Sequence, residues 1–313
     1  MEVREEQPAS ESAPREVSEQ KPLDARPSEG REVKAKPDVD MAALLKIKLP
    51  PLPNAALRIA ELTRDSNASA STIADAIGYD PFLAARILRA ANSSLYTRER
   101  HVTALTTAVN VLGARALYQL VISYAASSLF EKPSSRSHLE RELWKHSVFV
   151  GLAARVISLE MSRHGSEEAF LCGLLHDIGK ALMIRQNPEL YAPLAEITEE
   201  KRLLEKEQEV YGFTHPQVSA LVVNQWGLAP EISDAILNHH EPDEAIHSIL
   251  ITRSLNIANK LANASGFGLC QESDDTLAAD ESVFLLGLTD ERLREIREKA
   301  EEGLSEMMSI LSR

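Results

Sequence analysis

The sequence is poor in aromatic residues, cysteine and glycine, and each shortage narrows the class of protein. Aromatic residues make up 5% of the 313 residues, and there are 13 glycines. Because strands favour aromatic and β-branched residues, a chain with few aromatics and many alanines and leucines favours helices packed on helices. The two cysteines, Cys172 and Cys270, are too few for a disulfide scaffold and suit a reducing compartment.

Long apolar runs and an excess of positive charge are also missing. No run approaches the roughly 20 apolar residues that a membrane span needs, and residues 1–6 contain no apolar signal core. The formal net charge of −13 argues against a broad nucleic-acid surface, because an acidic surface repels phosphate. We therefore expect a cytoplasmic, globular protein that binds neither nucleic acid nor a membrane.

The first forty residues differ in composition from everything that follows. Eighteen of them are charged, five are proline and none is aromatic. Such a segment cannot bury enough apolar surface to offset the entropy lost on ordering. We expect residues 1–40 to be a disordered charged tail that is dispensable for folding.

From about residue 41 onward the sequence predicts an all-α fold in two helical lobes, residues 41–135 and 136–313, divided by a linker at 131–135. Capping signals mark several starts: Ser69 or Ser71, Asp80 before Pro81, and Ser166. The predicted helices cover residues 56–62, 73–78, 81–91, 103–113 and on to 129, 143–160, 166–180, 194–210, 216–226, 230–240, 251–261 and 289–310, with an acidic loop at 271–281.

Histidines beside apolar helical segments are the residues best suited to chemistry. Five of the nine histidines occur there: His146, His176, His215, His239 and His240. His176 and Asp177 occupy adjacent positions of a predicted helix, so an imidazole and a carboxylate can reach one metal ion. That mixture suits Fe, Mn, Ni or Zn rather than Ca, which prefers oxygen ligands. Cys172, one turn before His176, is better explained as a small buried apolar residue than as a ligand.

Several motifs together resemble the HDOD family, bacterial signalling modules related to HD-domain phosphohydrolases. The resemblance extends over about residues 44–265 and implies a two-lobed HDOD fold whose second lobe is an HD-type helical bundle. It rests on these stretches: Leu49-Pro50-Pro51-Leu52-Pro53, Asp80-Pro81, Ile87 to Ser93, Leu112-Gly113, Leu143 to Ser147, Leu174 to Lys180, His215-Pro216 and Trp226.

The resemblance also implies a set of metal ligands. HD phosphohydrolases use a histidine, a His-Asp pair and a later aspartate, and the first three match His146, His176 and Asp177. The HD-GYP group of cyclic-di-GMP phosphodiesterases adds ligands that match Glu142, His215, His239 and His240. We expect one or two divalent transition-metal ions, iron or manganese, with Asp177 and Lys180 as catalytic residues if the centre turns over phosphate esters. Asp177 would then orient a water, and Lys180 would neutralise charge on the phosphoryl oxygens.

Two departures from the pattern argue against catalysis. Asn259 stands where the late aspartate is expected, and an amide oxygen is a weaker, uncharged ligand. The Gly-Tyr-Pro signature is absent after His240, where the chain reads Glu241-Pro242-Asp243-Glu244. On this basis, Asn259→Asp is expected to tighten metal binding and to create or increase activity, because it places a charge against a dication.

Three functions are compatible with the sequence. The first is a regulatory module that binds metal, and a small phosphate or nucleotide ligand, and acts through protein partners in a bacterial signalling pathway. The second is an active metal-dependent phosphohydrolase or phosphodiesterase. The third is a helical scaffold whose histidines are incidental. The nearly complete ligand set favours retained metal, while Asn259 and the missing signature favour regulation over turnover.

Overall fold

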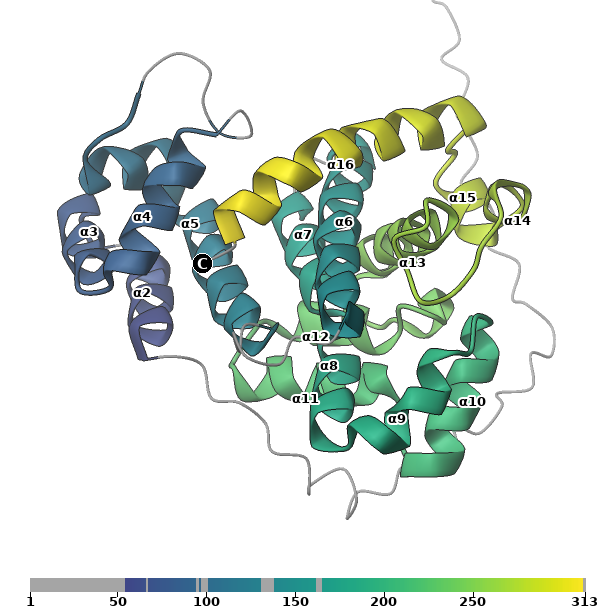
Figure 1. Ribbon diagram of the computed structural model, residues 1–313. Coiled ribbons are helices and arrows are strands. Elements are labelled where there is room, and N and C mark those ends of the chain that lie inside the picture. Colours follow the sequence, from purple (N-terminus) through teal and green to yellow (C-terminus); the bar gives the residue numbers. More distant parts are fainter. Residues whose placement is uncertain are drawn as a thin grey trace, which may run out of the picture. The chain divides into compact units, whose positions relative to one another are not determined.

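A computed structural model describes residues 54–65, 67–93, 96, 101–130, 138–161 and 165–311 (Figure 1). Within these ranges the regular elements are helices and no strand occurs, so the all-α prediction is confirmed. The predicted tail at 1–40, the proline-rich entry at 49–53 and the linker at 131–135 lie outside the described residues.

The first group of helices packs around one long helix, α5. Side-chain caps begin two of them as predicted: Ser69 accepts the amide N–H of Thr72, and Asp80 accepts those of Phe82 and Leu83. These helices are α2 (Asn54–Arg64), α3 (Ala70–Gly78), α4 (Pro81–Ala91) and α5 (Leu105–Phe130), and the first three all contact α5.

Helix α5 meets the length and composition of a membrane span over Leu105–Ser127, although no span is predicted from the apolar runs of the sequence. The helix breaks at Gly113, whose φ of 72° lies in the left-handed region, as the predicted end of a helix there requires. Half of its apolar stretch is buried in the protein. These features describe the core helix of a helical lobe as well as they describe a span.

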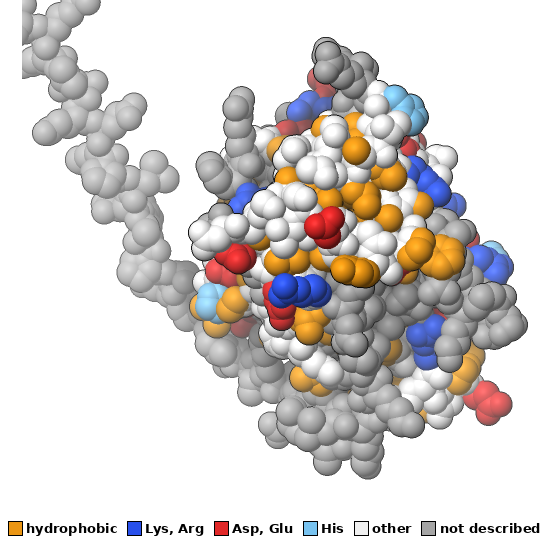
Figure 2. Space-filling model, turned by 90° about the vertical axis from the view of Figure 1, so that its left-hand side faces the viewer, with side chains coloured by type: hydrophobic (Ala, Val, Ile, Leu, Met, Phe, Trp, Pro, Cys, Tyr) orange, Lys and Arg blue, Asp and Glu red, His pale blue; other side chains and the backbone are white. Residues whose placement is uncertain are grey.

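The surface of this lobe carries several apolar side chains. Figure 2 faces the side on which α2, α3 and α4 lie and shows hydrophobic groups spread over it. Tyr79 is 89% exposed and Phe82 is 70% exposed, at the junction of α3 and α4.

The second group of helices includes α6, which packs against α7, α13 and α16, and it holds all the histidines of interest. Its members are α6 (His138–Met161), α7 (Ser166–Leu175), α8 (Ile178–Gln186), α9 (Pro188–Ala195), α10 (Glu200–Tyr211), α11 (His215–Gln225), α12 (Pro230–Leu237), the 3₁₀ turn η1 (Pro242–Glu244), α13 (Ile249–Ala264), α14 (Asp274–Ala278), α15 (Glu281–Leu285) and α16 (Asp290–Leu311).

Two close backbone contacts place the helices of this group. A Cβ atom on Gly173 of α7 would lie 2.5 Å from the Gly151 Cα of α6, so the two helices touch backbone to backbone. A Cβ on Gly179 of α8 would lie 2.3 Å from the His215 carbonyl oxygen of α11, and the Gly179 N–H donates to Ser219. Only glycine fits at such approaches, so both contacts bring the histidine-bearing helices together.

Helix α16 connects the two groups. It lies along α6 and reaches α4 and α5 at its C-terminal end (Figure 1). Arg89 of α4 donates to the backbone carbonyl of Ser309. The last helix therefore packs on both groups.

Several predicted boundaries in the second group are wrong. Ser166 is the first residue of α7, and the N-cap is Gly165, whose φ of 91° needs no side-chain cap. The polar segment 194–210 is not one helix: α9 ends at Ala195 and α10 begins at Glu200, and residues 196–199 between them are not helical. The predicted acidic loop at 271–281 contains the short helix α14, capped by Ser273.

We predict that Gly173→Ala destabilises the fold by about 1–3 kcal/mol, because the added methyl collides with the backbone of α6. Chemical denaturation followed by circular dichroism measures the change. Gly78→Ala is the matched control, because its Cβ would meet its nearest neighbour, Leu105, at 3.9 Å. Equal stability of the two variants would contradict the close approach.

Candidate metal centre

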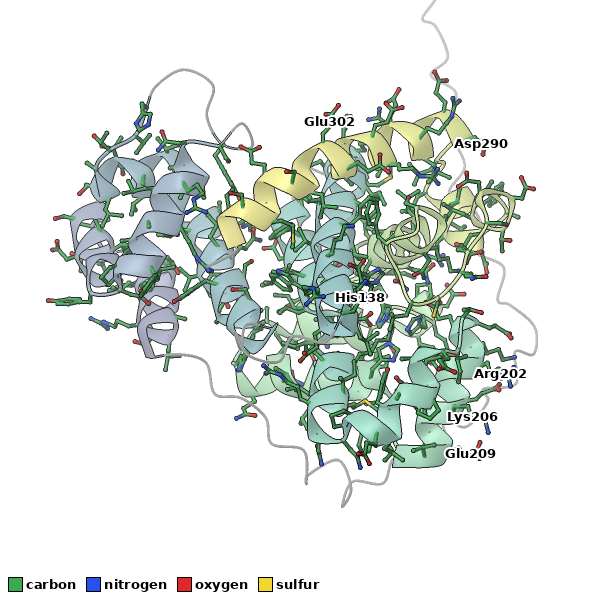
Figure 3. All side chains as sticks on the ribbon, viewed as in Figure 1. His138, Arg202, Lys206, Glu209, Asp290 and Glu302 are labelled. Carbon is green, nitrogen blue, oxygen red and sulfur yellow. The ribbon has the colours of Figure 1, made fainter. Side chains whose placement is uncertain are left out.

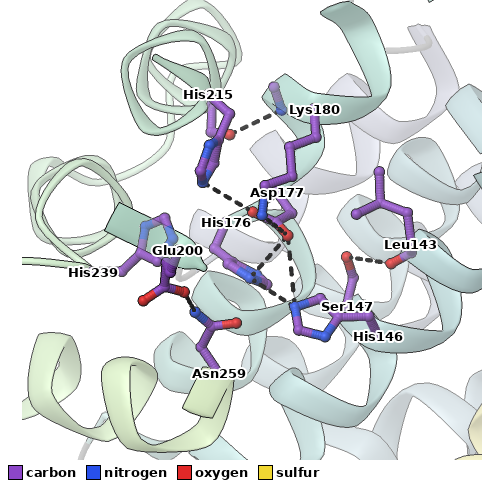
Figure 4. Close-up of polar contacts among 12 residues, drawn as sticks. Leu143, His146, Ser147, His176, Asp177, Lys180, Glu200, His215, His239 and Asn259 are labelled. Atoms are coloured by element: carbon purple, nitrogen blue, oxygen red, sulfur yellow. Dashed lines mark hydrogen bonds and ion pairs between the residues drawn. The ribbon is translucent and has the colours of Figure 1, made fainter. Parts of the chain in front are cut away.

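The centre is built from residues at or near the ends of four helices. His176 follows the last residue of α7 and Asp177 precedes the first residue of α8, so the pair occupies the turn between two helices and not one continuous helix as predicted. His215 is the first residue of α11, and His239 and His240 follow the end of α12. His146 projects from the first half of α6 toward this turn (Figure 4).

Six of the predicted residues converge in two adjacent groups. His146, His176 and Asp177 form one, and His215, His239 and His240 form the other. Within each group the potential ligand atoms lie within 4.8 Å of one another. Two pairs of imidazoles face each other through their Nε2 atoms, at 3.3 Å for His146 and His176 and at 3.1 Å for His215 and His240.

The Nδ1 atoms of four histidines are engaged on the outer side of the centre. Those of His176 and His239 lie 2.7 Å and 2.6 Å from the carbonyl oxygens of Gly173 and Ile236. Because a carbonyl only accepts, both Nδ1 atoms must carry the proton, which leaves each Nε2 with a free lone pair.

Carboxylates lie beside the other two Nδ1 atoms. The His215 Nδ1 lies 2.8 Å from Glu207, and the His240 Nδ1 lies 3.0 Å from Glu200. The outer partners thus turn every Nε2 of this set toward the centre.

Asp177 connects the two groups. Its Oδ2 lies 3.4 Å from the His176 Nε2 and 3.6 Å from the His146 Nε2, while its Oδ1 lies 3.3 Å from the His215 Nε2. Lys180, one turn along α8, donates to Oδ2 at 2.8 Å. A single carboxylate is therefore shared by both histidine groups and by one ammonium group.

Burial keeps the imidazoles neutral. His176, His215 and His239 are fully buried, and His146 is 3% exposed. Removal from water lowers the pKa of His146 to about 3, with a further contribution from His176, and lowers the pKa of each of the other three.

The charged groups of the centre support one another. Burial alone would raise the pKa of Asp177, but the neighbouring His176, Lys180, His215 and His146 together hold it well below its usual range. The same Asp177 raises the pKa of Lys180 against the effect of burial. Lys180 therefore stays charged in a nearly closed site, where it is 4% exposed.

The donor set fits one or two transition-metal ions. Ligands about 2.0–2.2 Å from a shared ion lie about 2.9–3.5 Å from each other, which is the range of the Nε2 contacts above. His239 Nε2 and Asp177 Oδ1 are buried and have no hydrogen-bond partner. Buried acceptors that nothing satisfies are expected where a cation binds.

Two other predicted ligands, Glu142 and Asn259, and the residue Cys172 lie outside the two ligand groups. Glu142, one turn before His146 on α6, belongs to neither group. Asn259 is buried on α13 and donates through its amide nitrogen to Glu200 at 2.7 Å. Cys172 is fully buried, directs its sulfur at the Ile232 carbonyl oxygen, and belongs to neither group.

Sequence reasoning missed two glutamates of α10. Glu207 is fully buried and accepts from the His215 backbone N–H, the His215 Nδ1 and the Tyr191 hydroxyl, each at 2.8 Å. Burial raises the pKa of Glu207 to about 7. Glu200, Leu203 and Glu207 follow an i, i+3, i+7 spacing, which places them on one helix face. That spacing was the available signal, but it was hidden in a helix read as uniformly polar.

The family follows from a comparison of sequences. The model of the HDOD domain matches residues 49–242, which is more than half of the chain. The chain belongs to the HDOD family. An uncharacterized protein of Treponema pallidum (strain Nichols) is 24% identical over 201 residues, which cover 61% of this chain and 37% of that protein. The chain thus spans well under half the length of this relative.

Solved structures agree on the HDOD fold. A "Putative phosphohydrolase" from Shewanella amazonensis SB2B is 26% identical, with a TM-score of 0.67, over 87% of this chain and 98% of that one. An HDOD domain protein from Geobacter sulfurreducens is 25% identical, with a TM-score of 0.66, over 85% and 93% of the two chains. The predicted family and fold are confirmed.

We predict that the metal-free protein loses stability as the pH falls from about 7 to about 5. The four buried histidines have lowered pKa values in the folded state, whereas unfolded histidine titrates near 6.5. The unfolded state therefore takes up protons first, and the stability present above about pH 6.5 is lost below it, by up to about 1.4 kcal/mol per pH unit for each histidine.

Denaturant unfolding across this pH range measures the slope. His239→Gln should reduce the slope, since it removes one of the titrating groups. His101→Gln, at an exposed histidine outside the centre, should leave the slope unchanged. A free energy of unfolding that is independent of pH over this range would show that the centre does not hold neutral imidazoles.

Proposed function

We propose that this HDOD protein is a regulatory module of bacterial signalling whose centre binds one or two divalent transition-metal ions, iron or manganese. The observation that carries the proposal is the inward orientation of the Nε2 atoms. Carbonyl or carboxylate oxygens lie beside the Nδ1 atoms of His176, His215, His239 and His240. Two inward atoms, His239 Nε2 and Asp177 Oδ1, have no hydrogen-bond partner in the protein. In a scaffold with incidental histidines, burying such a cluster would cost free energy without any compensating interaction.

The burial of the centre favours binding over turnover. His176, His215 and His239 have no exposed surface, and Asp177 is 1% exposed. Hydrolysis of a phosphodiester needs room for an ester with groups on both sides of the phosphorus and a route out for the product, whereas an ion or the terminal phosphate of a small ligand needs only a narrow path. The most accessible members lie beside α10, where the His240 side chain is 7% exposed and that of Glu200 is 23% exposed.

A small phosphate or nucleotide is the ligand class that the charges favour. Metal ions held in the centre would act as Lewis acids toward a phosphate group. Lys180 keeps its charge through Asp177 and would place an ammonium group beside a phosphate oxygen. Protein partners would bind the liganded state selectively, because a module without catalysis can pass on a signal only through such contacts.

The alternative is an active metal-dependent phosphohydrolase, in which Asp177 and Lys180 are catalytic. The shared position of Asp177 between two ligand groups favours it, because two-metal hydrolases use bridging groups of this kind. The similarity to the Shewanella amazonensis protein points the same way.

We predict that the purified wild type contains iron or manganese and that Asp177→Ala loses it, because Asp177 is the one carboxylate that lies between both histidine groups. Elemental analysis measures metal content, and circular dichroism should show an unchanged helical content, since the core is aliphatic. His101→Ala serves as the control, because this histidine is exposed and remote from the centre in sequence.

Turnover separates the module from the enzyme. With cyclic dinucleotides and a chromogenic phosphodiester, we expect no wild-type hydrolysis above the Asp177→Ala background. Robust wild-type turnover that Asp177→Ala abolishes would establish the phosphohydrolase instead. A wild type without metal after purification and after loading with Mn²⁺ would contradict both functions.

A further inference from the structure

Helix α10 has two charged faces with different surroundings. Arg202, Lys206 and Glu209 project from its outer face (Figure 3), where Lys206 pairs with Glu209. Glu207 is on the opposite, buried face. Burying a carboxylate is costly unless donors surround it, so the inner face requires a specific explanation that the outer face does not.

Each of these two glutamates, Glu200 and Glu207, lies against a different histidine of the same group. Glu207 accepts from the Nδ1 of His215, and Glu200 lies against the Nδ1 of His240. The two glutamates are seven residues apart, so two helical turns separate them along one face. The two imidazoles they hold face each other through Nε2 atoms 3.1 Å apart.

Asn259 completes this arrangement. Its amide donates to Glu200 Oε1 (Figure 4). The other carboxylate oxygen, Glu200 Oε2, lies 3.0 Å from the His240 Nδ1. An amide can donate to a carboxylate, whereas an aspartate at 259 would place a second negative charge at hydrogen-bond distance from Glu200. The asparagine therefore suits a residue that holds a glutamate better than it suits a metal ligand.

We propose that Glu200 and Glu207 are positioning residues for the metal ion bound by His215, His239 and His240, and that Asn259 holds Glu200 and does not ligate the ion. The inference rests on the proposed metal centre. The two carboxylates fix the Nδ1–H tautomers, raise the basicity of the ligating Nε2 atoms and bring negative charge next to the ion. Helix α10 thereby supplies the charge that Asn259 lacks.

This role reverses the expectation drawn from the sequence for Asn259→Asp. If residue 259 were a ligand, the new carboxylate would tighten metal binding. If Asn259 holds Glu200, the new carboxylate repels it, and binding at the His215 group weakens. The sign of one measurement distinguishes the two roles.

The test is titration of the full-length, metal-free protein with Co²⁺, followed by calorimetry and by the visible absorption of the bound ion. The variants are Glu200→Gln, Glu207→Gln and Asn259→Asp, with Glu209→Gln on the outer face of α10 as the matched control. For the wild type we expect two Co²⁺ sites. In each of the three variants we expect one site to weaken by about 10–100-fold and its spectrum to change, while the other site and the control stay as in the wild type.

A double variant tests the contact between residues 200 and 259 directly. Glu200→Gln with Asn259→Asp exchanges the amide and the carboxylate, so the hydrogen bond can form again. We expect this variant to bind Co²⁺ more tightly than Asn259→Asp alone, a non-additive result that a merely structural role of either residue does not give. If Glu207→Gln fails to fold, Glu200→Gln and the two Asn259 variants decide the question.

The outcomes separate the two proposals. A wild type that binds no Co²⁺ overturns the metal centre and this inference with it. A wild type that binds Co²⁺ normally, with Glu200→Gln and Glu207→Gln unchanged, overturns the role of the glutamates alone. Tighter binding in Asn259→Asp overturns the role given to Asn259 and makes residue 259 a ligand position.

Discussion

The arrangement of the second lobe depends on the Nε2 lone pairs of histidines that face each other in a buried space. The imidazoles of His176, His215 and His239 have their Nδ1 atoms bonded outward and present acceptors inward. Acceptors repel one another unless a cation lies between them. Helix ends from α7, α8, α11 and α12 all bring such groups to one point. Burial of the extensive aliphatic core around the centre offsets this repulsion in the folded chain.

Asp177 and Lys180 ease that repulsion in the protein itself. The carboxylate lies within reach of three histidines, and the ammonium group lies beside the carboxylate. A buried ion pair is stable only when its geometry is good and its remaining hydrogen-bonding groups are satisfied. One oxygen of Asp177 has no hydrogen-bond partner. The Asp177–Lys180 pair therefore reduces the free-energy cost of burying the histidine acceptors but does not remove it.

The sequence predicted the helices and the histidine groups well, for a clear physical reason. Asp80-Pro81 and Ser69 act locally, since a cap bonds only to the next turn, and the six residues of the two groups match motifs of one family. Glu200 and Glu207 could not be found in the same way, because their partners His240 and His215 lie 40 and 8 residues away and only the packing of α10 joins them. For Asn259 the sequence located the position but not its partner, since a ligand and a hydrogen-bond donor look alike until the neighbouring carboxylate is placed.

The contact between Gly151 and Gly173 has a consequence for the choice of ion. His146 and His176 project from two helices whose spacing is set by backbone meeting backbone, and the Gly173 carbonyl also accepts the His176 Nδ1–H. Flexible side chains at that contact would let the two imidazoles move apart to accommodate a larger ion. Here the separation is fixed by backbone atoms, so the proposed metal centre would discriminate between cations by radius as well as by the softness of its nitrogen donors.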